Sequence, residues 1–294
     1  MLYLVDASYF VFRAWFSMPE DMVDSDGNPV NALYGFTRFL GDFLENSNPE
    51  LVGVAFDTSL STCFRNEIYP NYKANREPAP EELKNQFARC RDITKALGLA
   101  DYAEERFEAD DIIGTLVMFM RTQGVNSTIL SKDKDLLQLL NTGDIMWDYA
   151  GGKRLHYKDV LSAFGVRPEQ VVDYLALAGD SVDNIPGVPG IGPKTASALL
   201  AHFESMDKIY ERLNEVAEVP IRGAAKLATK LSKHRDIAYL SRRLTKIACD
   251  VPMQLDLVSL KRVSPDFDTL NSLYDEANFG PTLRRQLDRI ASQF

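Results

Sequence analysis

Three carboxylates fall within four residues near the middle of the chain. Glu108, Asp110 and Asp111 come immediately before an apolar run that repeats at helical spacing. The free N–H groups and the dipole of a helix N-terminus favour one or two such acids, so a plain helix start explains part of the cluster. Three acids this close repel one another unless a cation lies among them, and oxygen ligands suit hard divalent ions. The cluster alone therefore leaves two interpretations open, a helix start and a metal site.

Further acids follow short apolar runs that have the length of buried strands. These runs are residues 1–5, 51–56 and 127–131, and the acids after them are Asp6, Asp57, Asp133 and Asp135. Helical patterns separate the runs, and strands that alternate with helices predict a parallel α/β sheet. An Asp after a strand often only caps the next helix. Because ligands bind at the carboxyl edge of such sheets, acids at three strand ends together predict a shared metal site.

The segment from residue 63 to 92 interleaves tyrosines with basic residues. It contains Arg65, Tyr72, Lys73 and Arg76, followed by a stretch rich in Pro and Glu. Such a composition is ordinary for a solvated loop before an amphipathic helix. Beside an acidic cleft, the same residues would stack on bases and hold phosphates. The sequence leaves both interpretations open.

The second half of the chain is expected to be helical around a glycine hairpin. A hairpin turn at residues 149–154 closes the α/β part, and Asp180 and Asp183 then follow at one-turn spacing on an expected helix end. The Gly- and Pro-rich residues 185–194 predict a tight hairpin between two helices. Most such loops are plain turns, but this one would leave N–H groups free to face a phosphate.

A basic run lies near the end of this half. Eight Lys and Arg fall between Arg222 and Lys246 against the single acid Asp236. A solvated helical face is the usual explanation of such a run. Close to a phosphate-binding hairpin, it is better explained as a face that binds duplex nucleic acid.

Composition limits the class of protein. The 294 residues include three scattered cysteines, no apolar run near the length of a membrane span and no signal-like N-terminus, so we expect a cytoplasmic protein that acts as a monomer. The net charge of −9 first argues against a nucleic-acid partner. The excess equals the nine acids singled out above, and bound divalent cations would neutralise much of it.

The motifs resemble the 5′-nuclease (flap endonuclease) family, which includes the N-terminal 5′–3′ exonuclease domain of bacterial DNA polymerase I. The resemblance runs from residue 1 to about residue 285. It rests on Val5-Asp6, Phe56-Asp57, Tyr72-Lys73-Ala74-Asn75-Arg76, Glu108-Ala109-Asp110-Asp111, Ser131-Lys132-Asp133-Lys134-Asp135-Leu136 and the stretch from Gly179 to Ala196. It implies a PIN-like α/β domain at residues 1–157, whose mostly parallel sheet is flanked by helices, with a helical arch at about 69–91. A helical domain at residues 158–294 would carry a helix–hairpin–helix element.

The resemblance also implies an activity and a set of roles. The expected reaction is structure-specific 5′–3′ exonuclease and 5′-flap cleavage of DNA with two Mg²⁺ or Mn²⁺ ions. The first ion would be held by Asp6, Asp57, Glu108 and Asp110, and the second by Asp133, Asp135 and Asp180, with Asp111 and Asp183 acting through water. Lys73 and Arg76 would stabilise the reacting phosphate. The expected DNA contacts are Arg65, Tyr72, Gly187, Gly190, Gly192, Lys194, Thr195, Arg242 and Arg243, with a K⁺ ion at Val188 and Ile191.

Two other classes of function remain open at this point. One is a DNA-binding relative without catalysis, which the complete acid set and Lys73 disfavour. The other is a PIN-type ribonuclease, which the hairpin and the basic helical half disfavour. The chain ends at Phe294, where a polymerase I would continue, so we expect either a stand-alone protein or a part of a longer one.

Overall fold

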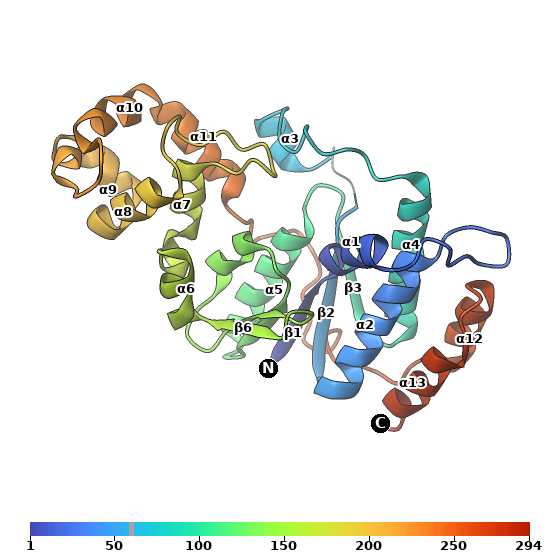
Figure 1. Cartoon of the computed structure of the whole chain (residues 1–294). Coiled ribbons are helices and arrows are strands. Elements are labelled where there is room, and N and C mark those ends of the chain that lie inside the picture. Colours follow the sequence, from blue (N-terminus) through green and yellow to red (C-terminus); the bar gives the residue numbers. More distant parts are fainter. Residues whose placement is uncertain (59–61) are drawn as a thin grey trace.

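A six-stranded sheet forms the centre of the first half of the molecule (Figure 1). The computed structural model describes residues 1–58 and 62–294. The strand order is β3-β2-β1-β4-β5-β6, and only the last pair is antiparallel. The strands are β1 (Leu2–Asp6), β2 (Leu51–Phe56), β3 (Ala100–Ala103), β4 (Ser127–Leu130), β5 (Ile145–Asp148) and β6 (Lys153–His156). The predicted parallel sheet is confirmed, and β3 is a strand that the sequence analysis missed.

Helices cover both faces of this sheet. Successive side chains of β1 alternate between the two faces, so Leu4 packs with α5 (Ala109–Thr122) and Val5 packs with the helices of the other face. Those helices are α1 (Ala7–Ser17), α2 (Asn31–Ser47) and α4 (Glu81–Ala96). The carboxyl ends of β1, β2 and β4 therefore open at one edge, close to the start of α5.

The expected arch at residues 69–91 is two different structures. Residues 69–80 follow the short helix α3 (Phe64–Ile68) and cross above the carboxyl edge of the strands, as Figure 1 shows. Residues 81–91 belong to α4, whose Leu83, Gln86 and Cys90 are buried. Gln86 accepts a hydrogen bond from the N–H of Leu33 in α2. The helical part of the expected arch is thus packed on the core, and only residues 69–80 span the cleft.

The helical half gathers at one end of the molecule (Figure 1). Its elements are α6 (Tyr157–Phe164), η2 (Pro168–Gln170), α7 (Val171–Ala178), α8 (Pro193–Phe203), α9 (Met206–Glu211), η3 (Leu213–Glu218), η4 (Ala224–Lys226), α10 (Leu227–Lys233) and α11 (Arg235–Thr245). The predicted hairpin joins α7 to α8. Asp180 and Asp183 follow α7 on a turn, because Gly179 leaves the helical conformation at φ +77°. The expectation that both lie on a helix end was therefore wrong.

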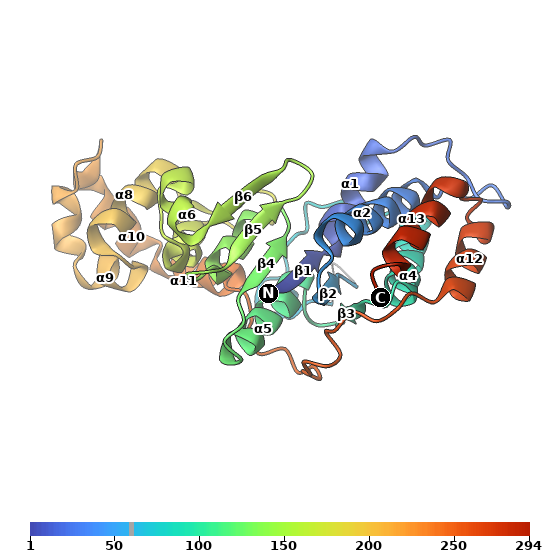
Figure 2. The same ribbon diagram turned by 90° about the horizontal axis from the view of Figure 1, so that it is seen from below.

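The chain then returns to the first half. Residues 246–266 run back along the sheet, where the N–H of Val263 donates to the carbonyl of Gly98 at 3.0 Å. The last helices, α12 (Phe267–Glu276) and α13 (Pro281–Ala291), pack against α4 and α2. Figure 2 shows them at the end of the molecule opposite α8–α10. The expected division at residue 157 placed these two helices in the second domain, whereas here they pack on the first half of the chain. The sequence could not show this, because the amphipathic pattern of α12 and α13 does not specify which surface they cover.

No helix in the described residues is long and apolar enough to cross a membrane.

Candidate active site

Eight of the nine predicted acids line one cleft at the carboxyl edge of the sheet. The cleft has a volume of about 600 Å³ and takes residues from both halves of the chain. Its acids are Asp6, Asp57, Glu108, Asp110, Asp133, Asp135, Asp180 and Asp183. Lys73 and Arg76, from the segment that crosses the cleft, also line it, as do Lys132 and Lys134. The acids after β1, β2 and β4 therefore line one cleft, while the metal that the sequence predicted among them stays a prediction.

The strand-end acids also serve as caps, with one carboxylate oxygen each. Oδ1 of Asp6 accepts from the N–H of Tyr9 at the start of α1, and Oδ1 of Asp133 accepts from the N–H of Asp135 at the start of η1 (Lys134–Leu139). Oδ1 of Asp57 accepts from the N–H of Ala109 at the start of α5. The capping interpretation and the cleft interpretation therefore both hold, since capping fixes each side chain and leaves it at the cleft.

Two serines that the sequence analysis overlooked orient these acids. Ser131 Oγ donates to Oδ2 of Asp6 at 2.7 Å and accepts from the N–H of Asp133 at 3.0 Å. Ser8 Oγ accepts from the N–H of Asp57 at 3.0 Å. Each serine follows a strand within two residues, which is the only signal of its role that the sequence contains.

Asp111, expected to act on a metal through water, does not line the cleft. Its side chain is fully buried, and both oxygens accept hydrogen bonds from the guanidinium of Arg65 at 2.7 Å. It also caps α5, because its Oδ2 accepts from the N–H of Glu108. Of the three crowded acids, Asp111 is thus the one that the helix start explains, while Glu108 and Asp110 face the cleft.

Arg65, an expected DNA contact, is instead a buried structural residue. It is 2% exposed and donates to the carbonyls of Leu244 and Lys246, at the end of α11, at 2.8 and 3.0 Å. Nη1 also lies 3.3 Å from Oε2 of Glu108. The carboxylates hold the pKa of Arg65 above its ordinary value although burial opposes the charge. Arg65 therefore joins the base of the cleft-crossing segment to α5 and α11.

Tyr72, another expected DNA contact, is also buried. It is 3% exposed, and its hydroxyl donates to Oε2 of Glu108 at 2.9 Å. Burial, together with the charges of Glu108 and Asp183, raises the pKa of Tyr72, so the phenol stays protonated as a donor. The predicted stacking residue is a hydrogen-bond donor that orients a cleft carboxylate.

The two expected catalytic cations are tied to cleft acids. Nζ of Lys73 forms an ion pair with Glu108 and lies 3.7 Å from Oδ2 of Asp183, and Arg76 pairs with Asp183. Lys73 adopts a left-handed backbone conformation at φ +54°, which costs free energy for a residue with a Cβ. Its N–H donates to the carbonyl of Asp183 at 3.0 Å. The ion pairs and this hydrogen bond thus hold the segment at residues 71–76 over the turn at 180–184, against the cost of the strained backbone.

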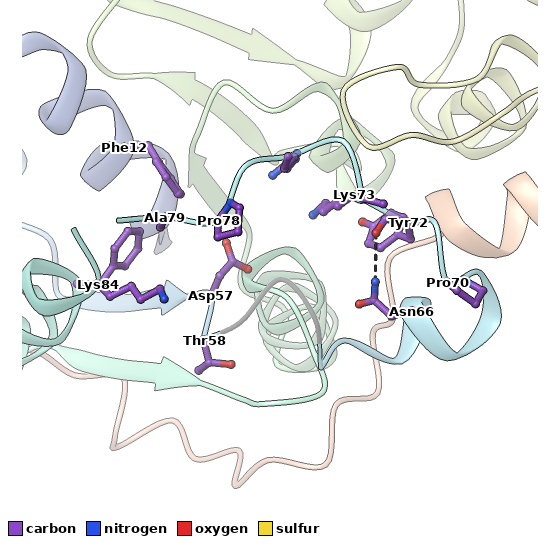
Figure 3. A pocket seen from close by; sticks show the side chains of 13 residues that line it. Phe12, Asp57, Thr58, Asn66, Pro70, Tyr72, Lys73, Pro78, Ala79 and Lys84 are labelled. Atoms are coloured by element: carbon purple, nitrogen blue, oxygen red, sulfur yellow. Dashed lines mark hydrogen bonds between the residues drawn. The ribbon is translucent and has the colours of Figure 1, made fainter. Parts of the chain in front are cut away.

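A second cavity lies beneath the same segment, on its other side. It has a volume of about 800 Å³ and shares four lining residues with the acid cleft, namely Phe12, Asp57, Lys73 and Arg76. Figure 3 shows Asp57 and Lys73 entering it from opposite sides, the one from the end of β2 and the other from the crossing segment. Phe12, Pro70 and Pro78 contribute apolar surface. The crossing segment therefore borders two cavities.

The remaining acids repel one another. Burial and then neighbouring carboxylates raise the pKa of Asp6 to about 7 and hold the pKa values of Asp110 and Asp135 well above 3.8. Glu108 is the opposite case: although burial opposes its charge, Lys73, Arg65 and Tyr72 lower its pKa. Protein cations therefore compensate one part of the cleft and leave the other part short of positive charge.

The donor set of this uncompensated part fits a divalent ion. Within residues 1–58 and 62–294, no three acidic, His or Cys side chains are arranged so that they could hold a metal ion as they stand. Asp135 Oδ1, however, is buried and has no hydrogen-bond partner among the described residues, and a carboxylate oxygen left in this way among other carboxylates suits a cation. The carboxylates carry the hard oxygen donors of Mg²⁺ and Mn²⁺ sites.

The hairpin between α7 and α8 has the shape that the sequence predicted. A Cβ on Gly187, at φ +61°, would lie 2.3 Å from the backbone N of Gly179, so only glycine fits there. Gly190 is exposed at φ +79°, and Nζ of Lys230 lies 2.7 Å from the place of its missing Cβ. The predicted contacts Gly192, Lys194 and Thr195 start α8, whereas Val188 and Ile191 bury their side chains and would offer a K⁺ ion only carbonyl groups.

The two arginines predicted on the DNA face differ. Arg242 pairs with Asp173 and Asp207 at 2.9 Å, so it holds α11 to α7 and α9. Arg243, the next residue, is exposed. The structure therefore leaves Arg243 as the better candidate for contact with a phosphate, and it assigns Arg242 a structural role.

Comparisons with known proteins agree with this fold. The family model described as "5'-3' exonuclease, N-terminal resolvase-like domain" matches residues 1–165, and "5'-3' exonuclease, C-terminal SAM fold" matches residues 166–268. A 5'-3' exonuclease of Aquifex aeolicus is 34% identical over 292 residues, which cover 99% of this chain and 96% of that protein. The chain therefore belongs to the 5′–3′ exonuclease family, as the motifs predicted.

Two further similarities extend the comparison. DNA polymerase I of Rhizobium leguminosarum is 41% identical over 266 residues, which are 88% of this chain but 26% of the polymerase. The chain thus spans about a quarter of that relative. The bacteriophage T5 flap endonuclease, crystallised with DNA and metal ions, matches with a TM-score of 0.65 at 19% identity over 99% of this chain and 98% of that one. This likeness confirms the expected fold.

The contrast between Asp110 and Asp111 gives a first prediction. In EDTA, Asp111→Asn should lower the free energy of unfolding by about 3 kcal/mol, because it leaves Arg65 buried without its full counter-charge. Asp110→Asn should not destabilise the protein, because it removes a carboxylate that other acids repel. Urea unfolding of both variants measures this, and each is the control for the other. Equal stabilities would contradict the assigned roles.

The raised pKa of Asp6 gives a second prediction. Because its folded-state pKa of about 7 exceeds the ordinary 3.8, the stability that it contributes is present at low pH and is lost as the pH rises through 7. In EDTA the melting temperature should therefore fall between pH 6 and pH 8, and added Mg²⁺ should raise it more at pH 8 than at pH 6. Thermal unfolding at both pH values tests this. The Mg²⁺ effect should depend less on pH in Asp6→Asn, and an equal effect at both pH values in the wild type would contradict the prediction.

Proposed function

We propose that this chain is a divalent-metal-dependent 5′-nuclease that hydrolyses phosphodiester bonds of DNA at 5′ ends, flaps or nicks. The observation that carries the proposal is the convergence of eight acids, from three strand ends, the start of α5 and the 180–184 turn, on one cleft that Lys73 and Arg76 enter. The relatives named exonuclease and flap endonuclease support it. Two bound Mg²⁺ or Mn²⁺ ions would stabilise the attacking and the leaving oxygen of the scissile phosphate.

By the family resemblance, Asp6, Asp57, Glu108 and Asp110 would hold one ion, and Asp133, Asp135 and Asp180 would hold the other. Asp110 and Asp133 are neighbours, because besides burial the charge of Asp133 helps to raise the pKa of Asp110. Asp183 would act through water and through Arg76 and Lys73. The serines and helix N–H groups described above fix the carboxylates, so the chain supplies preorganised oxygens.

Lys73 and Arg76 would hold the reacting phosphate. Both now pair with carboxylates, and a phosphate and bound cations would compete for those pairs. Once released, the ammonium and the guanidinium would contact the developing negative charge. The cavities on both sides of the crossing segment leave room for a single strand with a 5′ end.

The helical half would hold the duplex without reading its sequence. The exposed hairpin at Gly190, the cation of Lys230 beside it and the exposed Arg243 support contacts with phosphates, which carry no base information. A K⁺ ion at the hairpin carbonyls would add a further contact to the phosphates. Because the hairpin and the acid cleft lie in different parts of the molecule, the separation between them would determine where the 5′ strand is cut.

Product mapping on a 5′-flap DNA tests the activity. With Mg²⁺ we expect cleavage near the flap junction, and none in EDTA or in Asp180→Asn. Lys73→Ala should lower the rate about a hundredfold, the usual loss for one preorganised electrostatic contact, with little loss of DNA affinity. A parallel RNA flap separates a DNA nuclease from a PIN-type ribonuclease. Full activity in EDTA would overturn the metal mechanism. Normal cleavage by Lys73→Ala would show that Lys73 has a structural role and does not act on the reacting phosphate.

The DNA face gives a separate prediction. Charge reversal of Arg243 to Glu should weaken binding to duplexes of unrelated sequence equally. It should also flatten the dependence of affinity on salt, by about 0.9 in log–log slope for each phosphate that the variant no longer neutralises. Dissociation constants over a salt series measure this, with Ca²⁺ in place of Mg²⁺. The matched control is Arg285→Glu on α13, which is at the other end of the molecule and should keep the wild-type slope. An unchanged slope in Arg243→Glu would mean that its face is only solvated.

A further inference from the structure

Lys134 lies between two cleft acids and contacts a third. It is the first residue of η1, with Asp133 before it and Asp135 after it. Its Nζ is 2.8 Å from Oδ2 of Asp180, whose side chain is 7% exposed, whereas the lysine side chain is 43% exposed. Oδ1 of Asp180 accepts from the N–H of Val182 at 2.8 Å. Both oxygens of Asp180 are therefore occupied, one by the backbone and one by a long side chain that reaches in from the cleft mouth.

The backbone around Asp180 is also fixed. Its N–H donates to the carbonyl of Ile185 at 2.9 Å, and its carbonyl accepts from the N–H of Ile185 at 2.7 Å. This paired turn leaves the carboxylate little freedom to seek another partner. Of its two side-chain contacts, the one with Lys134 is the one that can be exchanged without breaking the turn.

Asp135, the acid on the other side of Lys134 in the sequence, has an unpartnered carboxylate oxygen within the part of the chain that the structure describes. This oxygen, Oδ1, is buried. Burial and the neighbouring carboxylates raise the pKa of Asp135, and the charge of Lys134 opposes that rise. The lysine is thus a positive charge inserted among the three acids Asp133, Asp135 and Asp180, in a place where a divalent ion would also be attracted.

We propose that Lys134 is a positioning residue: it holds Asp180 as an internal counter-ion and yields this carboxylate to a divalent ion. The inference rests on the proposed function, in which these three acids hold the second ion. An ammonium and a metal ion at the same carboxylate oxygen would repel each other, so the two cations compete and binding of the ion favours opening of the ion pair. Lys134 therefore stabilises the metal-free protein and weakens binding of the second ion.

The test removes the charge and measures metal binding without DNA. Lys134→Met keeps the length of the side chain and loses its charge. Lys132→Met is the matched control, because Lys132 also lines the cleft and lies two residues away, but it is 68% exposed and is 3.9 Å from Asp148. Lys134→Arg restores the charge. The full chain is titrated with Mn²⁺ by calorimetry, and thermal unfolding is followed in EDTA and in saturating Mn²⁺.

We expect Lys134→Met to lower the stability of the metal-free protein and to raise its affinity for Mn²⁺. In EDTA, Lys134→Met should melt below the wild type, because Asp180 loses its counter-ion. Its weaker class of Mn²⁺ sites should tighten about tenfold, the change that corresponds to about 1.4 kcal/mol of lost competition. Saturating Mn²⁺ should remove the difference in melting temperature. Lys132→Met should behave as the wild type, because it leaves the ion pair between Lys134 and Asp180 intact. Lys134→Arg should also behave as the wild type, because the guanidinium replaces the ammonium as the cation.

Two outcomes separate this inference from the proposed function. If Asp180→Asn weakens Mn²⁺ binding but Lys134→Met behaves as Lys132→Met, the role of Lys134 is overturned and the metal site stands. If Asp180→Asn leaves Mn²⁺ binding unchanged, the metal assignment fails, and the inference falls with it. In the Asp180→Asn background, Lys134→Met should have no further effect on Mn²⁺ affinity, and a tenfold gain there would also overturn the inference.

Discussion

The buried ion pair between Arg65 and Asp111 is the contact on which the site depends. The pair fixes the start of α5, from which Glu108 and Asp110 reach the cleft. The same guanidinium of Arg65 donates to two carbonyls at the end of α11. The N–H of Ala248 donates to Asp111 as well, at 2.8 Å. Breaking a buried pair of this kind leaves an uncompensated charge in the interior. The acid cleft and the helical half therefore share one anchor that neither of them exposes.

Around this anchor, the cleft balances charges in two layers. The inner layer is buried and permanent, with Arg65 and Tyr72 holding Asp111 and Glu108. The outer layer consists of Lys73, Arg76 and Lys134, whose side chains are partly exposed and pair with acids at the cleft surface. The contacts of Arg76 and Lys134, whose side chains are 34% and 43% exposed, can be exchanged for a phosphate or a metal ion at lower cost than the buried pairs. An enzyme site that must bind both kinds of charge needs this difference in burial.

The sequence predicted those features that local pattern determines. Apolar runs that end in Asp located β1, β2, β4 and their shared edge, and the glycines located the hairpin. Burial was the part that could not be predicted. Arg65 and Tyr72 have the composition of a DNA-binding loop, and only packing against Asp111 and Glu108 makes them structural. The roles of Ser8 and Ser131, and the surface that α12 and α13 cover, depend equally on contacts between distant segments.

The return of the chain after α11 has a mechanical consequence. The helical half leaves the sheet after β6 and rejoins it through residues 246–266, so two separate connections, and not one, carry it. A body held by a single strand can swivel about that strand, whereas one held at two points rotates only about the line that joins them. The separation between the hairpin and the acid cleft is thus restricted by covalent connectivity as well as by packing. If the helical half binds duplex DNA as proposed, the distance between that duplex and the acid cleft would then stay nearly the same from one reaction to the next.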